Sequence, residues 1–158
     1  NDSEQELFIN NHSLKDQIRS KEITSQVSGI SSLNEIRKFL VSEQKKIGEK
    51  GGLVAEGRDI GTAVFPNADL KIFLTASIDE RAKRRKLELE LKGKKKIDFV
   101  EIKNEIKKRD LQDSTRKISP LKKAKDAYEI NTDGLTINEV CEKIINLFNT
   151  KIPKELEI

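Results

Sequence analysis

The sequence has little of what marks disulfide-rich, metal-binding or membrane proteins. Among its 158 residues there is one cysteine, one histidine, no tryptophan and no methionine. A single cysteine, Cys141, excludes an intramolecular disulfide framework and leaves no cysteine–histidine cluster for a metal. No apolar run approaches the ~20 residues that span a bilayer, and the first residues lack the basic start and apolar core of a signal peptide. We therefore expect a cytoplasmic protein with no membrane partner.

Aromatic residues are also scarce, at 4% of the chain. Since binding of single-stranded nucleic acid relies on stacking platforms, we expect no nucleic acid partner. Charged residues make up 37% and the formal net charge is +4. This modest excess permits binding to phosphates without choosing among them. The length fits one domain with its own core.

Hydrophobic spacing predicts an α/β fold with a mostly parallel sheet, because short apolar runs alternate with segments of helical period. The expected strands are residues 53–55, 70–75 and 127–131, and the expected helices are residues 33–47, 79–92, 99–111 and 137–148. Ser32 and Ser77 are candidate N-caps. Cys141 lies on the apolar face of the last helix, where we expect core packing.

The most informative segment is LVAEGRDIGTAVFP, residues 53–66. Its apolar start predicts a buried strand, and the loop that follows carries Glu56, Arg58 and Asp59 beside two glycines. Ligands of open α/β sheets bind beyond the carboxyl ends of the strands. An acid, a guanidinium and a second acid at that point could bind a polar, anionic ligand. The alternative is a surface turn with solvated charges.

Two further basic clusters follow. Arg109, Asp113 and Arg116 share one helical face, where two guanidiniums beside a carboxylate could bind a phosphate and a sugar hydroxyl; an exposed ion-pair ladder is the alternative. Arg81 and Arg85 belong to a cluster on the preceding helix, whose glutamates could simply pair with it. Three basic clusters around one crevice favour phosphoryl transfer, which needs positive donors around anionic oxygens.

The order and spacing of these motifs resemble the bacterial cytidylate kinases, members of the P-loop nucleoside monophosphate kinase group. The resemblance rests on EGRDIGTAVFPNADLKIFLTASIDERAKRR, the spaced EIKKRD..DS.R, SPL, A.DA and the closing LTINEV. It implies a three-layer P-loop kinase fold with a mostly parallel sheet, a small monophosphate-binding insert and a short lid. The implied divisions are a partial insert at 1–30, core at 31–92 and 114–158, and a lid region at 93–113.

Carried over by position, the resemblance implies that Ser28, Arg37 and Asp59 read the cytosine base. Asp59 can accept from the exocyclic amino group, and Arg37 and Ser28 can donate to the ring nitrogen and carbonyl oxygen. Arg58 and Arg116 correspond to clamps on the monophosphate.

The remaining roles implied by the resemblance concern the sugar and the phosphoryl donor. Arg109 and Asp113 face the sugar, with Arg109 also near the transferring phosphoryl group. Arg81 and Arg85 approach ATP from the lid. Glu56, which stands where related kinases often have Asp, organises the water shell of Mg²⁺. The implied reaction moves the γ-phosphoryl group of ATP, with Mg²⁺, to CMP or dCMP, and we expect a monomer.

One expected motif is absent from the printed sequence. The resemblance implies a G-x-x-x-x-G-K-[ST] loop at the start of such a kinase, and none occurs. Together with the lack of an initiator methionine, this leads us to expect a preceding segment that carries the P-loop strand and helix. If the sequence were complete, the alternative is a non-catalytic module that binds a nucleotide or nucleic acid.

Overall fold

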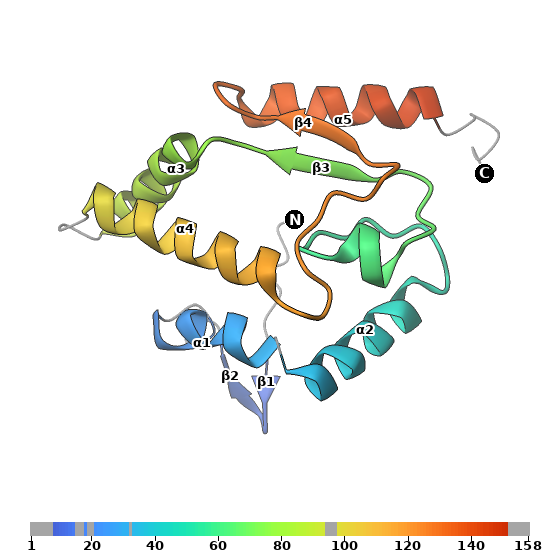
Figure 1. Ribbon diagram of the computed structural model, residues 1–158, viewed down its shortest axis with the longest axis horizontal. Helices are drawn as coiled ribbons and strands as arrows, with labels where there is room; N and C mark the ends of the chain where they lie inside the picture. The colour runs from blue at the N-terminus through green and yellow to red at the C-terminus, as the bar shows by residue number, and fades with distance from the viewer. Residues whose placement is uncertain (1–7, 15–17, 19–20, 32, 94–97, 152–158) are drawn as a thin grey trace.

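The computed structural model describes residues 8–14, 18, 21–31, 33–93 and 98–151, and shows helices arranged around a small sheet (Figure 1). The elements in chain order are β1 (Phe8–Ile9), β2 (His12–Ser13), α1 (Lys21–Ser31), α2 (Asn34–Gly48), the π-helical turn η2 (Ile60–Val64), β3 (Ile72–Thr75), α3 (Ile78–Leu91), α4 (Phe99–Thr115), β4 (Tyr128–Asn131) and α5 (Ile137–Lys151). The mixed α/β class expected from the sequence is confirmed.

Strands β3 and β4 form a parallel pair. The register runs from Ile72 opposite Tyr128 to Thr75 opposite Asn131. Beyond the last pair, the backbone N–H of Thr132 donates to the Thr75 carbonyl oxygen at 2.8 Å, and the Thr132 hydroxyl donates to the same oxygen at 3.0 Å. Two of the three expected strands thus exist, side by side and in the expected orientation.

The strand expected at residues 53–55 is wrong for the described structure. Residues 53–56 have no regular structure, and Val54 is 98% exposed. A strand is held by backbone hydrogen bonds to a neighbour, and within the described residues the backbone of 53–58 makes none. The apolar run predicted a paired strand, but no described segment forms backbone hydrogen bonds with it.

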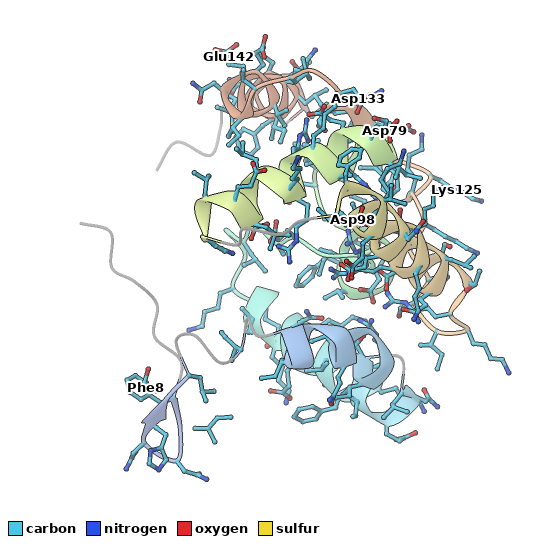
Figure 2. The ribbon with its side chains drawn as sticks, turned by 90° about the vertical axis from the view of Figure 1, so that its left-hand side faces the viewer. Phe8, Asp79, Asp98, Lys125, Asp133 and Glu142 are labelled. Carbon is cyan, nitrogen blue, oxygen red and sulfur yellow. The ribbon has the colours of Figure 1, made fainter. Side chains whose placement is uncertain are left out.

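Helices α3 and α4 pack against each other as an antiparallel hairpin beyond the end of β3 (Figure 2). The Ser77 side chain caps α3 by accepting from the Glu80 N–H at 3.1 Å, as the sequence predicted. Ala82 on α3 and Ile102 on α4 are buried. Helix α4 also contacts α1.

Helix α5 lies beside β4, where the Lys151 ammonium is 5.4 Å from the centre of the Tyr128 ring. The helix itself is confirmed, but the expected core packing of Cys141 is wrong, because its side chain is exposed. None of the α5 residues is buried. A pair of strands covers too little of the helix to bury its whole apolar stripe.

Helix α2 and the turn η2 pack together at the other end of the molecule. Leu33 occupies the N-cap position of α2 without a side-chain hydrogen bond; Ser32, the expected cap, lies outside the described residues. Gly48 lets Phe65 approach closely, because a Cβ atom there would lie 2.4 Å from the ring. This packing brings the loop before η2 against α2.

The β1–β2 hairpin lies below α1 in Figure 1 and stands apart from the helices in Figure 2. Its turn residues Asn10 and Asn11 have φ values of 49° and 64°. Two successive left-handed residues make the type I′ turn that suits a tight hairpin, and asparagine tolerates that conformation.

Candidate functional site

A polar cavity of about 180 Å³ opens where α2, the loop before η2 and the C-terminal half of α4 meet. Its charged and amide side chains come from segments far apart in the sequence. They are Arg37, Gln44, Glu56, Arg58, Asp59, Arg109, Asp113 and Arg116. At ~30 Å³ per water the volume equals about six waters, so the cavity could enclose a ring-sized group, with the rest of a larger ligand outside.

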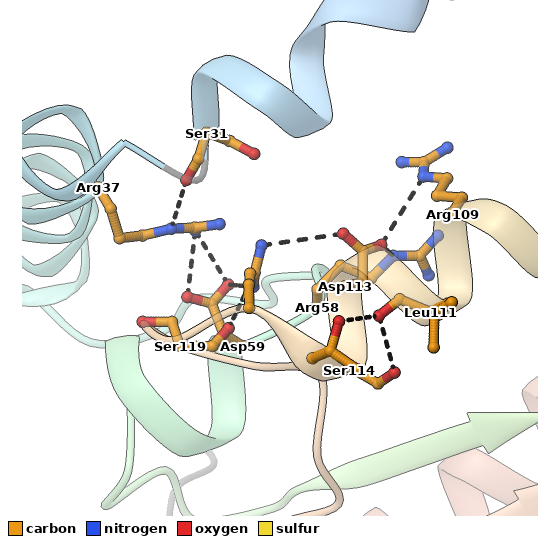
Figure 3. A network of polar contacts seen from close by, with 11 residues as sticks. Ser31, Arg37, Arg58, Asp59, Arg109, Leu111, Asp113, Ser114 and Ser119 are labelled. Carbon is orange, nitrogen blue, oxygen red and sulfur yellow. Dashed lines mark hydrogen bonds and ion pairs between the residues drawn. The ribbon is translucent and has the colours of Figure 1, made fainter.

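The first element of the site is a buried pair between α2 and the loop before η2 (Figure 3). The Arg37 Nη1 atom donates to both carboxylate oxygens of Asp59, at 3.2 and 3.1 Å. Its Nε atom donates to the Ser31 carbonyl oxygen at 3.1 Å, at the end of α1. The side chains of Arg37 and Asp59 are only 11% and 6% exposed, so the pair forms a rigid wall of the cavity.

The second element surrounds Asp113 on α4. Its Oδ2 atom accepts a hydrogen bond from Arg58 Nε at 3.1 Å, and Arg109 Nε lies 3.8 Å from the same oxygen. The Asp113 side chain is 7% exposed, whereas those of Arg58 and Arg109 are 44% and 52% exposed. One buried carboxylate therefore anchors two arginines whose ends remain open to solvent.

Arg116 joins the two elements. Its Nη2 atom is 3.6 Å from Asp59 Oδ1, and Nη1 is 3.9 Å from Asp113 Oδ1. The Nε atom donates to the Ser119 carbonyl oxygen at 2.6 Å. Among the described residues the buried Nη2 atom has no hydrogen-bond partner. Burial lowers the pKa of the Arg116 guanidinium, and the nearby charge of Arg37 lowers it further; an arginine still stays charged at neutral pH.

The balance of charge leaves the cavity positive. Among the described residues, four guanidinium groups line it with two buried carboxylates, and the exposed Glu56 carboxylate adds a third negative charge. Fork-shaped donors with spare N–H groups suit phosphate and carboxylate oxygens. The buried Asp59 could accept from an N–H of the same ligand. The cavity can therefore bind an anion joined to a polar ring.

The structure brings most of the predicted site residues together. Arg37, Glu56, Arg58, Asp59, Arg109, Asp113 and Arg116 all line this one cavity. The side chain of Ser28 lies outside the described residues. The ion-pair ladder offered as the alternative for α4 exists in part, because Arg109 and Arg116 both lie within 4 Å of Asp113, but the same residues also face the cavity.

The arginines of α3 do not line the cavity. The Arg81 guanidinium makes two parallel hydrogen bonds with Asp110 of α4, at 3.2 and 2.5 Å. Arg85 donates to Glu88 at 2.7 Å, one turn further along α3. The alternative of local ion pairing thus describes Arg85, while Arg81 also ties the two helices together.

Sequence reasoning missed Gln44, which lines the cavity from α2. Its spacing of seven residues from Arg37, two turns along the same helical face, was the available signal. In the described part of the chain, no group of three His, Cys, Asp or Glu side chains could hold a metal ion. Nor is any helix found there long and apolar enough to cross a membrane.

Comparison with known proteins matches the chain to one family along most of its length. The family model described as Cytidylate kinase matches residues 1–150. The chain is 65% identical over 156 residues to a bifunctional pantoate ligase/cytidylate kinase of Prochlorococcus marinus subsp. pastoris, which covers 99% of this chain and 31% of that protein. The similarly described protein of strain NATL1A is 54% identical over 153 residues, 97% of this chain and 30% of that protein. The chain thus spans about a third of the curated relatives it matches.

Proposed function

Because this chain belongs to the cytidylate kinase family, we propose that it supplies the monophosphate-binding site of a protein that transfers the γ-phosphoryl group of ATP to CMP or dCMP. The products are CDP or dCDP and ADP. The observation that carries the proposal is the cavity with Arg37 paired to Asp59 on one wall and arginines around Asp113 on the other.

In this proposal the cytosine base lies against the cavity wall formed by Arg37 and Asp59. The Asp59 carboxylate accepts from the exocyclic amino group, and Arg37 donates to the ring nitrogen or carbonyl oxygen, with Ser28 as the further donor. Arg37 already holds Asp59 through two hydrogen bonds, so the carboxylate is oriented before the ligand arrives. Uracil would place a carbonyl oxygen against Asp59, two acceptors with no proton between them.

The monophosphate lies between Arg58 and Arg116, and the sugar faces Arg109 and Asp113. The open end of Arg58 supports this assignment, and so does the Nη2 atom of Arg116, which makes no hydrogen bond among the described residues. Each has N–H groups to offer an anion. Arg109 additionally stabilises charge on the transferring phosphoryl group. Such catalysis works by positioning and electrostatic stabilisation, without a covalent intermediate.

The donor side involves the proposed P-loop kinase fold and its lid. Arg81 and Arg85 on α3 approach ATP when the lid region, residues 93–113, closes. Mg²⁺ in such enzymes is held by phosphate oxygens, waters and one or two carboxylates, and Glu56 is an exposed carboxylate at the cavity that suits contact through water. Mg²⁺ would neutralise phosphate charge on the donor.

The test is the steady-state phosphorylation of CMP and UMP by the full-length protein. We expect Arg58→Ala to lower kcat/KM for CMP by about 100-fold, the scale for loss of one charged donor. We expect Asp59→Ala to lower the ratio of kcat/KM for CMP over UMP. Lys45→Ala, an exposed change on α2, is the matched control and should leave both values unchanged. Unaltered turnover in Arg58→Ala, or equal use of CMP and UMP by the natural protein, would refute these assignments.

A further inference from the structure

Gln44 is an amide residue of the cavity to which the proposed function gives no role. It lies on α2 and lines the cavity. Its Oε1 atom is buried and has no hydrogen-bond partner among the described residues. Burying a carbonyl oxygen is unfavourable unless a donor reaches it. A ligand that brings an N–H to this point would satisfy it.

The position of Gln44 relates it to the wall that holds the base. Gln44 comes seven residues after Arg37, about two turns further along the same face of α2. Side chains of a helix lean toward its N-terminus, so the Gln44 amide leans toward the turn that carries Arg37. Arg37 in turn holds Asp59 at the same cavity. Gln44 and Asp59 thus line the same cavity.

The chemistry of the cytosine base supplies the missing donor. Its exocyclic amino group carries two N–H bonds, and Asp59 as proposed accepts one of them. The guanidinium groups around the cavity only donate, the Asp113 carboxylate is engaged by arginines, and the Glu56 side chain is exposed. Among the described side chains that line the cavity, Gln44 Oε1 is the buried acceptor that these contacts leave open.

We propose that Gln44 Oε1 accepts the second amino hydrogen of cytosine, which makes Gln44 a base-binding residue of the monophosphate site. This inference rests on the proposed function and adds one contact to it. Glutamine can turn its amide, so Gln44 strengthens cytosine binding, whereas Asp59, which only accepts, excludes uracil. Replacing Gln44 by an acid of the same length should therefore keep CMP binding and sharpen the exclusion of UMP.

The experiment is a cycle of two ligands and two proteins, measured as equilibrium Kd values by calorimetry on the full-length protein. The ligands are CMP and its 4-deamino analogue, the pyrimidin-2-one ribonucleoside monophosphate, which has hydrogen in place of the amino group. Gln44→Leu removes the acceptor with little change in volume. We expect it to weaken CMP binding about fivefold, the scale of one net hydrogen bond, and to leave the Kd of the analogue unchanged.

Equal weakening of both ligands would overturn the inference, because Gln44 would then only support the cavity wall; an unchanged Kd for CMP would overturn it as well. Gln44→Glu covers the case in which the leucine variant does not fold, and a CMP-over-UMP ratio no higher than that of the natural protein would count against the proposal. Gln112→Leu, at an exposed glutamine on α4, is the matched control. If the natural protein does not bind CMP, the proposed function itself is overturned. This result is distinct from a failure of the Gln44 inference, in which the natural protein binds CMP but Gln44→Leu does not weaken CMP binding selectively.

Discussion

The buried pair between Arg37 and Asp59 should contribute more to stability than any exposed ion pair of this chain. Asp59→Asn keeps the shape and one acceptor oxygen but removes the charge that faces Arg37 and Arg116. Both guanidiniums are about nine-tenths buried, so Arg37 would lose the carboxylate it is paired with, and Arg116 would keep only Asp113 as a neighbouring negative charge. Breaking one partner of a buried pair costs about 3–5 kcal/mol. We place this variant at the low end, near ~3 kcal/mol, because its remaining oxygen can still accept one hydrogen bond from Arg37.

The assay is differential scanning calorimetry of the full-length protein with and without CMP. The transition that CMP shifts upward identifies the domain formed by this chain, because a ligand stabilises only the fold that binds it. A loss of ~3 kcal/mol should lower that Tm by about 6–12 °C for a domain of this size. Arg37→Met alone should have a similar effect, and in the double variant the two losses should not add, with a coupling of about 2 kcal/mol.

The matched control lies on the same helix. Glu35 and Lys38 form an exposed pair with 3.8 Å between the charged atoms, and Glu35→Gln should change stability by less than ~0.5 kcal/mol. If Asp59→Asn shifts the Tm no more than Glu35→Gln, or if the losses at Arg37 and Asp59 add fully, the pair does not act as the structure indicates and the reasoning fails.

Two further predictions concern packing away from the cavity. The hydrogen bond from the buried Lys71 lowers the pKa of the Asp126 carboxyl below its usual 3.8, so the stability that this contact contributes is present above pH 3.8 and is lost as the pH falls through the lower pKa of the folded state. Asp126→Asn should therefore lower the Tm at pH 7, and its difference in Tm from the natural protein should shrink below pH 3.8. A difference in Tm that does not change with pH would contradict this. Gly48→Ala should lower the free energy of unfolding, measured in urea, by about 1–3 kcal/mol, because its Cβ would lie 2.4 Å from the Phe65 ring. Gly29→Ala is the control, since the space around its Cβ is open. Equal changes in the free energy of unfolding for the two variants would refute the close contact.

Much of the fold could be predicted from local pattern. The spacing of apolar residues located α2, α3, α4 and α5, and the two runs that became β3 and β4. Ser77 was recognised as a cap because an N-cap needs only its own helix. Elements of this kind depend on nearest neighbours along the chain, and those neighbours are visible in the sequence.

The failures are all statements about burial. The apolar pattern predicted a buried strand at residues 53–55 and core packing for Cys141. In the structure, Val54 and Cys141 are both exposed. An apolar pattern predicts that a face prefers to be covered. Whether it is covered depends on which segments lie against it, and that information is not local.

The sequence alone was enough to identify the family and seven of the residues that line the cavity, because motif order and residue type carry both. It also placed Arg109, Asp113 and Arg116 on one face, since helical spacing decides that. Only the tertiary structure decided the pairing: Arg37 with Asp59, 22 residues away, and Arg58 with Asp113, 55 residues away. Partners at such separations are chosen by the path of the chain, and electrostatic attraction between arginine and any acid does not distinguish among the 27 acidic residues available.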